Sequence, residues 1–167
     1  YDTICHEHLE YYSLKQIQFM AEVVGLKIND VVFSTANGGS FRVTVSKKQS
    51  KYKAHEDFLR QVLASEKKKK FHTMKPFLAF EKNIIRHKYA LLKFLQRNLK
   101  DGKTILGYGA STKGNVILQY CGLTPKEIPF IAEVNEDKFG KFTPGTYIPI
   151  ISEKEARKIN PHYFIVL

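Results

Sequence analysis

The sequence has 167 residues, of which 43% are hydrophobic, enough to form a core in one domain or in a domain with an extension. Only two cysteines, Cys5 and Cys121, are present, which excludes a disulfide framework and a four-cysteine zinc site. No apolar run approaches the ~18 residues of a membrane helix, and no secretory signal opens the chain, so we expect a globular, cytoplasmic protein with reduced thiols. Because the chain opens on Tyr1 and stops on the apolar run 165–167, we expect a fragment of a longer protein.

The formal net charge of +11 favours an anionic partner, whether nucleic acid, a membrane surface or a phosphorylated small molecule. The densest basic block, residues 67–70, follows an amphipathic helical pattern and is typical of a solvated helix end. Most of the phenylalanines and tyrosines occupy periodic apolar positions that are typical of a core. We therefore expect neither nucleic acid nor a membrane as the partner.

Two histidines flank a glutamate near the start of the chain, at His6, Glu7 and His8. In an extended segment, the two histidines would share one face and the glutamate would point to the other. An imidazole titrates near neutrality and can remove a proton at physiological pH, and a neighbouring carboxylate can orient it. The structural alternative is a hydrogen-bonded pair of histidines in a loop. A metal site is disfavoured, because His-x-His supplies only two ligands.

A helix and a hairpin are predicted next. Ser13 and Gln16 make a capping box, and Gly25 ends the helix. Four apolar residues are expected on one helical face: Ile17, Met20, Val23 and Val24. Residues 26–34 and 41–46 have strand patterns separated by a glycine-containing turn, which indicates a β-hairpin. Arg42 follows this turn, and its guanidinium could form bidentate hydrogen bonds to a phosphate or a sugar oxygen. The alternative is that Arg42 is an exposed structural arginine.

Residues 51–101 have a helical pattern with a break near Pro76. In the longer second helix, apolar residues recur every seven positions and end at Asp101 and Gly102, which is typical of a packing stripe. We interpret these helices as a connector between an amino-terminal piece and a domain that begins near Gly102.

In residues 103–115, a short buried strand at 105–106 is followed by three glycines, two hydroxyl residues and a lysine before a helical run at 116–120. Glycine lets a backbone approach a ligand, and the free N–H groups of a helix start favour a phosphate. A dinucleotide fingerprint would need glycine at Thr112, and a P-loop would need Lys-Ser or Lys-Thr at residues 115–116. A site for a phosphate-bearing ligand and a tight turn that binds nothing therefore both stay open.

A second strand, residues 128–134, carries Glu133 at its end, where a carboxylate in a βαβ unit commonly holds a ribose hydroxyl. A loop with Lys138 would run beside the same crevice. A capping box at residues 152–155 starts a short helix, and residues 163–167 form a further strand. The predicted fold is α/β and Rossmann-like, a mostly parallel sheet with flanking helices, preceded by a helix, a β-hairpin and a helical connector.

Four stretches together resemble one family, the S-adenosylmethionine-dependent C-methyltransferases that act on nucleotide-linked deoxysugars. The match is to their carboxy-terminal region, with order and spacing kept along almost the whole chain. It is carried by Cys5-His6-Glu7-His8 with Tyr12-Ser13-Leu14, by Gly38-Gly39-Ser40-Phe41-Arg42, by Gly107 to Asn115, and by Lys138 to Gly140 with Pro144 to Ile150.

The resemblance implies three domains in the intact enzyme: an amino-terminal zinc module, a central methyltransferase domain and a Rossmann-like domain that helps to hold the nucleotide sugar. By this resemblance, residues 1–50 end the central domain, residues 51–101 are the connector, and residues 102–167 are the nucleotide-sugar domain, which we expect to be truncated. The zinc and the S-adenosylmethionine site would lie in the missing part, so we expect the fragment alone to be inactive.

The resemblance also implies a chemistry for the histidine cluster, in which a base removes the proton beside a sugar ketone and the enolate attacks the methyl donor. His8 would be the base, Glu7 would orient it, and His6 would lie close to the sugar. Cys5 stands where the family usually has a tyrosine, and Glu133 stands where it usually has an aspartate, so an altered substrate or a lower activity is expected.

The expected substrate is a nucleotide sugar linked to thymidine diphosphate. Two alternatives stay open: a non-catalytic nucleotide or nucleotide-sugar binding module, and a fragment of an NAD-dependent oxidoreductase, which the glycine spacing disfavours. The predicted substrate site consists of Cys5, Arg42, Gly107, Gly109, Ser111, Thr112, Lys113, Gly114, Asn115, Glu133 and Lys138.

Overall fold

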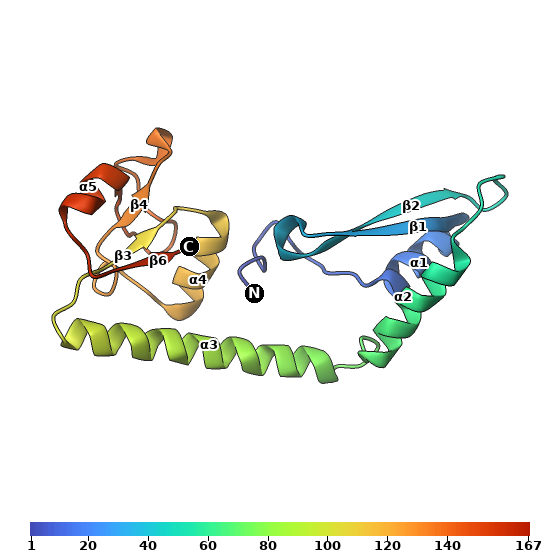
Figure 1. The fold of residues 1–167 in the computed structure, drawn as a ribbon, viewed down its shortest axis with the longest axis horizontal. Coiled ribbons are helices and arrows are strands. Elements are labelled where there is room, and N and C mark those ends of the chain that lie inside the picture. Colours follow the sequence, from blue (N-terminus) through green and yellow to red (C-terminus); the bar gives the residue numbers. More distant parts are fainter. The chain divides into compact units, whose positions relative to one another are not determined.

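The computed structural model describes the backbone of residues 1–167 and every side chain except that of Asn37. The chain forms two compact units, one made of residues 10–81 and the other of residues 1–9 together with 82–167. Each unit has its own hydrophobic core. The division lies inside the long helix α3 (Lys75–Lys100; Figure 1), whereas the domain boundaries predicted after residues 50 and 101 stay a prediction.

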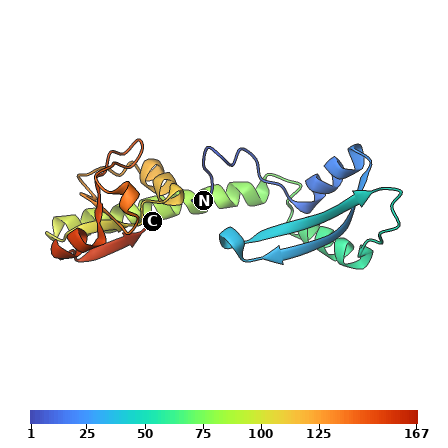
Figure 2. The same cartoon turned by 90° about the horizontal axis from the view of Figure 1, so that it is seen from above.

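The unit of residues 10–81 is a hairpin covered on one face by two helices (Figure 2). Its elements in chain order are α1 (Leu14–Val23), β1 (Leu26–Ser34), the 3-10 turn η1 (Ala36–Gly38), β2 (Ser40–Lys47) and α2 (Glu56–Lys68). The strands pair antiparallel, with Val31 opposite Val43 and a bulge after Ile28. The predicted hairpin and the capping box of Ser13 and Gln16 are both confirmed.

Of the four residues predicted for the apolar face of α1, Ile17 packs against the core of the hairpin, whereas Met20, Val23 and Val24 are exposed. Leu14 and Ala21 are buried against the hairpin, whereas Val23 is 69% exposed. At 3.6 residues per turn, Val23 lies about half a turn around the helix from Leu14. The prediction failed for Met20, Val23 and Val24 because it counted apolar residues without knowing which side of the helix the hairpin would cover.

The second unit contains a four-stranded, all-parallel sheet in the order β5-β4-β3-β6. The strands are β3 (Ile105–Tyr108), β4 (Ile131–Glu133), β5 (Ile150–Ser152) and β6 (Tyr163–Val166), joined by α4 (Thr112–Cys121), the 3-10 turn η2 (Glu136–Lys138) and α5 (Glu153–Lys158). From the central β3 the chain moves outward to β4 and β5, and then returns to the other side of β3 as β6. This is the winding of a Rossmann half, so the predicted α/β fold is confirmed.

Helices cover both faces of this sheet, with α4 and α5 on opposite sides (Figure 1). Side chains of β3 alternate between the faces, as a strand requires. Ile105 packs with Leu118 of α4 and Leu95 of α3, whereas Leu106 packs with Ala156 of α5. Two covered faces explain why the strands are so apolar.

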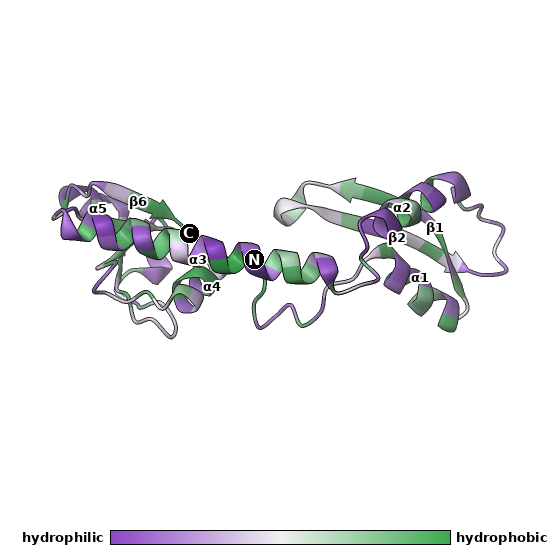
Figure 3. Ribbon diagram, turned by 90° about the horizontal axis from the view of Figure 1, so that it is seen from below, coloured by the Kyte–Doolittle hydropathy of each residue, from purple (hydrophilic) through white to green (hydrophobic). Residues whose placement is uncertain are grey.

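Only part of the apolar stripe of α3 packs against other described residues. Leu91, Leu92 and Leu95 pack against the sheet, whereas Phe77 and Leu78 near its start are exposed. Figure 3 shows hydrophobic and hydrophilic residues alternating in bands along this helix. No helix in the described part of the chain is long and apolar enough to cross a membrane.

Three boundaries differ from the sequence prediction. Helix α4 begins at Thr112 rather than at residue 116, so Gly114 and Asn115 belong to its first turn. The expected strand 128–134 contains only three paired residues, Ile131–Glu133. Strand β5 was not predicted, because Pro149 and the glycines before it made this stretch look like a loop.

We expect Gly114→Ala to lower the free energy of unfolding of the chain. A Cβ at this position would lie 2.6 Å from the Cβ of Leu167 and 3.2 Å from its backbone carbonyl carbon. Overpacking costs about 1 to 3 kcal/mol, and because a 2.6 Å contact forces neighbouring atoms to move we expect about 2 to 3 kcal/mol, more than the gain of about 1 kcal/mol that alanine brings to a helix. Urea unfolding should show a net loss of about 1 to 2 kcal/mol.

The matched control for this variant is Thr112→Ala, on the exposed first position of the same helix. It should change the stability by less than about 0.5 kcal/mol. A Gly114→Ala protein that is as stable as the wild type would contradict the close packing of α4 against the residue that follows β6.

Candidate functional site

A tight turn joins β3 to α4 at the carboxyl edge of the sheet. Gly109 has φ = +91°, a backbone conformation that glycine adopts without strain, and its N–H donates to the carbonyl of Ala132 over 2.8 Å. Ser111 is the N-cap of α4, and its Oγ accepts a hydrogen bond from the N–H of Gly114 over 2.9 Å. The turn therefore spans residues 109–111 and is shorter than the predicted loop.

The side chain of Glu133, at the end of β4, braces this turn. One of its oxygens, Oε2, accepts hydrogen bonds from the N–H of Ala110 at 2.8 Å and from the Nζ of Lys138 at 3.3 Å. The other, Oε1, accepts from the N–H groups of Val134 at 2.8 Å and Asn135 at 3.1 Å. We call this set of contacts the Glu133 brace.

The brace keeps the buried Glu133 ionised. The residue is only 8% exposed, and burial by itself would raise its pKa. The backbone N–H groups and the Lys138 ammonium outweigh this effect and lower the pKa from 4.5 to about 2. Because each carboxylate oxygen already accepts two hydrogen bonds, a ribose hydroxyl could bind Glu133 only by replacing one of them.

Lys138, the other residue predicted for this crevice, is also engaged within the protein. Its Nζ donates to the carbonyl of Ala110 at 2.9 Å as well as to Glu133. Ala110 therefore contacts the brace through both its N–H and its carbonyl oxygen.

The glycines around the turn allow close packing rather than leaving open space. A Cβ on Gly107 would lie 2.3 Å from the Cδ1 of Ile131 and 2.9 Å from the Cδ1 of Leu167. A Cβ on Gly109 would lie 3.3 Å from the carbonyl oxygen of Leu167, and one on Gly114 would overlap the Leu167 Cβ. Leu167 therefore occupies the space next to all three glycines.

The first turn of α4 keeps donors that an anion could use. The backbone N–H groups of Ser111, Thr112 and Lys113 have no acceptor within the part of the chain that the structure describes. The positive end of the helix dipole lies at the same place. The Thr112 side chain is exposed, the Lys113 side chain is half-buried, and the Oδ1 of Asn115 is buried without a partner among the described residues.

The histidine segment forms two turns and is not extended, so the predicted alternation of its side chains is wrong. The N–H of His8 donates to the carbonyl of Cys5 at 3.0 Å, which closes a turn over residues 5–8. Glu7 lies beside His6, with 3.8 Å between Oε1 and Nε2. The His6 and Glu7 side chains are exposed, and the Cys5 residue is half-buried.

The imidazole of His8 is held in one tautomer. Its Nδ1 lies 2.7 Å from the carbonyl oxygen of Thr3, and only a protonated Nδ1 can donate to that oxygen. In the neutral ring, Nε2 is then the unprotonated nitrogen and can accept a proton. The side chain that we predicted as a base therefore has a tautomer suited to that role.

The structure divides the predicted site residues between its two units. The histidine segment, the glycine turn, Glu133 and Lys138 all belong to the unit of residues 1–9 and 82–167. Arg42 belongs to the other unit, where it is exposed on β2 opposite Val32. Among the described residues, no group of three or more His, Cys, Asp or Glu side chains is placed to hold a metal, and the zinc of an amino-terminal module stays a prediction.

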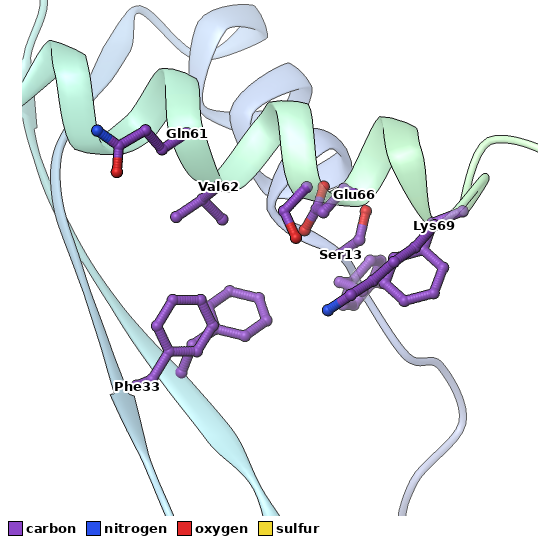
Figure 4. A pocket seen from close by; sticks show the side chains of 10 residues that line it. Ser13, Phe33, Gln61, Val62, Glu66 and Lys69 are labelled. Carbon is purple, nitrogen blue, oxygen red and sulfur yellow. The ribbon is translucent and has the colours of Figure 1, made fainter.

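Sequence reasoning did not find a hollow of about 360 Å³ in the unit of residues 10–81 (Figure 4). Phe33 of the hairpin lies on one side of it, and Val62, Glu66 and Lys69 lie on the other. Glu66 is already engaged, because its two oxygens accept the N–H groups of Leu14 at 2.7 Å and Lys15 at 3.2 Å at the start of α1. The hollow has no local sequence signal, since its lining comes from four separate stretches.

The fold and the glycine turn define a Rossmann-like domain with an anion-compatible helix start, and comparison with known proteins identifies its class. The chain belongs to the C-methyltransferase C-terminal domain family, whose sequence model matches residues 35–167. It is 32% identical over its 167 residues to the C-methyltransferase NovU of Streptomyces niveus. The chain spans 40% of the length of that relative.

We expect Glu133→Gln to destabilise the chain by about 1.5 to 3 kcal/mol at pH 7, the usual worth of hydrogen bonds to a charged group. The glutamine side chain would carry an NH₂ group in place of one carboxylate oxygen, and this group cannot accept the hydrogen bonds that the brace donates. Because folding lowers the pKa of Glu133, its contribution is complete above pH 4.5 and is lost as the pH falls toward about 2. Urea unfolding over this range should show the difference between wild type and variant shrinking as the pH falls.

Glu136→Gln is the matched control, because Glu136 is an exposed carboxylate three residues away. It should have an effect within about 0.5 kcal/mol at every pH. A Glu133→Gln protein that behaved like this control would show that the brace does not stabilise the fold.

Proposed function

We propose that this chain is the carboxy-terminal part of a C-methyltransferase that uses S-adenosylmethionine and acts on a nucleotide-linked keto-deoxysugar. Membership of the C-methyltransferase C-terminal domain family supports the reaction class. The observation that carries the proposal is the hydrogen bond from Nδ1 of His8 to the carbonyl of Thr3, which fixes the tautomer in which Nε2 is the basic nitrogen of the neutral ring.

The residues of this chain would provide the base and part of the substrate site. His8 would remove the proton from the sugar carbon beside the ketone, and the carbanion would be stabilised as an enolate. S-adenosylmethionine would supply the electrophilic methyl group, whose bond to the sulfonium sulfur would break as the new bond to this carbon forms, leaving S-adenosylhomocysteine. Among the described residues, Leu167 occupies the space beside the glycines of the turn, so we assign the methyl-donor site to another part of the intact protein.

The nucleotide end of the substrate would bind at the start of α4. A diphosphate could accept hydrogen bonds from the N–H groups of Ser111, Thr112 and Lys113, and it would lie at the positive end of the helix dipole. The Lys113 side chain would add a charge-assisted contact. Thymidine diphosphate is the nucleotide that we propose for this position.

The structure also bears on the two alternative functions. An NAD-dependent oxidoreductase would need a carboxylate that is ready to receive the ribose, whereas the oxygens of Glu133 are already fully hydrogen-bonded. A non-catalytic binding module would keep the anion site at α4 but would not use His8.

We expect His8→Gln in the intact enzyme to lower both methylation and proton exchange at the sugar carbon, because both need the same base. General base catalysis contributes about 10²- to 10⁴-fold, and the loss should fall in that range. Deuterium incorporation from D₂O into a thymidine-diphosphate-linked keto-deoxysugar measures the exchange by NMR, and circular dichroism confirms the fold of each variant.

Two further variants sharpen this test. Glu7→Gln should have a smaller effect than His8→Gln, since Glu7 lies beside His6. His72→Gln, which changes an exposed histidine of the other unit, should leave both rates unchanged. A loss of less than about fivefold in His8→Gln would show that His8 is not the base and would favour the non-catalytic module.

We expect Lys113→Ala to weaken the binding of thymidine diphosphate by about 1.5 to 3 kcal/mol, the worth of a charged hydrogen bond. Calorimetric titration at low salt measures the affinity, which should fall as salt is added. Lys113 is a cleaner target than Gly109, because a side chain on Gly109 would be strained at its φ of +91° and would press on Leu167.

Pyrophosphate is the control ligand in this titration, and Lys141→Ala is the control variant, since Lys141 is an exposed lysine in a different loop. Tighter binding of thymidine diphosphate than of pyrophosphate would support a site that recognises a nucleotide. Equal, weak and salt-sensitive binding of both, unchanged by Lys113→Ala, would reduce it to general attraction by a chain of charge +11.

A further inference from the structure

The segment that carries the histidines is attached to the second unit through the side chain of Tyr1. The Tyr1 ring makes edge-to-face contacts with His87 of α3, at 5.4 Å between ring centroids, and with Tyr120 of α4, at 5.6 Å. Its hydroxyl lies 2.9 Å from the Nδ1 of His87. The side chain is only 12% exposed, whereas residues 6–10 are all exposed.

The site that receives the Tyr1 ring, which we call the seat, is stabilised by contacts between α3 and α4. Lys88, next to His87 on α3, donates from Nζ to the carbonyl of Tyr120 at 2.7 Å and also lies 4.7 Å from the centroid of the Tyr120 ring. Aromatic pairs of this geometry contribute about 0.5 to 1.5 kcal/mol beyond the area that they bury. Tyr1 therefore has a preformed place between α3 and α4.

The contact between Tyr1 and His87 is compatible with either tautomer of the histidine. Burial raises the pKa of Tyr1 to about 12, so the hydroxyl stays protonated at neutral pH. It can donate to an unprotonated Nδ1 of His87, and it can accept from a protonated one.

A short series of local hydrogen bonds joins Tyr1 to the imidazole of His8. The carbonyl of Tyr1 accepts the N–H of Ile4 at 2.9 Å. The carbonyl of Thr3 accepts both the N–H of Cys5 at 3.1 Å and the Nδ1 of His8 at 2.7 Å. Residues 1–8 therefore form two linked turns, and the tyrosine at one end restricts where the imidazole at the other end can lie.

We propose that Tyr1 is a positioning residue, whose ring, seated between His87 and Tyr120, holds the two turns so that His8 keeps the tautomer and place of a base on the Rossmann-like unit. This inference rests on the proposed function, in which His8 removes the proton. The inference adds that His8 and the amino-terminal end of α4, where we propose that the diphosphate binds, belong to the same structural unit.

The test uses the intact protein and two measurements that need no substrate. The first is amide hydrogen exchange of residues 2–8, which reports whether the segment is docked. The second is the nitrogen NMR spectrum of ¹⁵N-histidine-labelled protein, in which the His8 signals are assigned by their loss in His8→Gln. A fixed tautomer gives one protonated and one unprotonated nitrogen, whereas a free neutral imidazole gives averaged signals.

We expect Tyr1→Ala to speed exchange of residues 2–8 by at least about tenfold and to average the two His8 nitrogen signals, while exchange in β3 and β6 stays unchanged. His87→Ala should act in the same direction. Tyr1→Phe keeps both ring contacts and should preserve the fixed tautomer. Tyr89→Ala, which removes an exposed tyrosine two residues after His87 on α3, is the matched control and should match the wild type.

Wild-type exchange and a fixed tautomer in Tyr1→Ala would show that Tyr1 is not the anchor. Faster exchange with an unchanged His8 tautomer would show that the turns alone hold the imidazole, which would also overturn the positioning role. Full enzymatic activity of His8→Gln would show that His8 is not the base, so Tyr1 would have no catalytic group to position. That failure is distinct from the first two, because the exchange and NMR results do not depend on activity.

Discussion

The carboxylate of Glu133 is the contact on which the functional edge of the sheet depends. It is buried at the end of β4 and joins the turn after β3, the first residues after β4 and the ammonium of Lys138. A buried charge without partners would be strongly unfavourable, whereas here each oxygen accepts two hydrogen bonds. The start of α4, and with it any anion site there, is therefore positioned by a residue that has no need to touch the ligand.

The sequence was sufficient to predict those parts of the fold whose signals are local. The capping boxes that open α1 and α5 were found because the two residues that make each box are only three positions apart. Gly122 ends α4 in a left-handed conformation, as a glycine after a helix predicts. The parallel sheet followed from the alternation of strands and helices. Strand β5 was missed because its three residues are too few to show a period against the loop before them.

The candidate site was harder to predict because its contacts are not local. The pattern of Gly107, Gly109 and Gly114 suggested close approach of a phosphate, and the close approach is real, but the group that approaches is Leu167. Nothing near the glycines in sequence indicates that partner. In the same way, the place of Glu133 at a strand end was predicted correctly, whereas its four hydrogen-bond donors became apparent only once the turns were placed.

The packing of Leu167 beside the glycines and the hydrogen bonds of Glu133 limit which ligands the Rossmann-like unit can bind. A dinucleotide site uses the whole crevice at the point where the strand order reverses, here between β3 and β6, together with a carboxylate for the ribose. In this chain Leu167 lies beside the glycines of that crevice and the carboxylate is engaged, which leaves the N–H groups of Ser111 to Lys113. These N–H groups can bind the diphosphate part of a nucleotide. If the intact enzyme binds a nucleotide sugar, its selectivity for the base and the sugar must therefore come mainly from other surfaces, and this helix start would contribute charge and orientation.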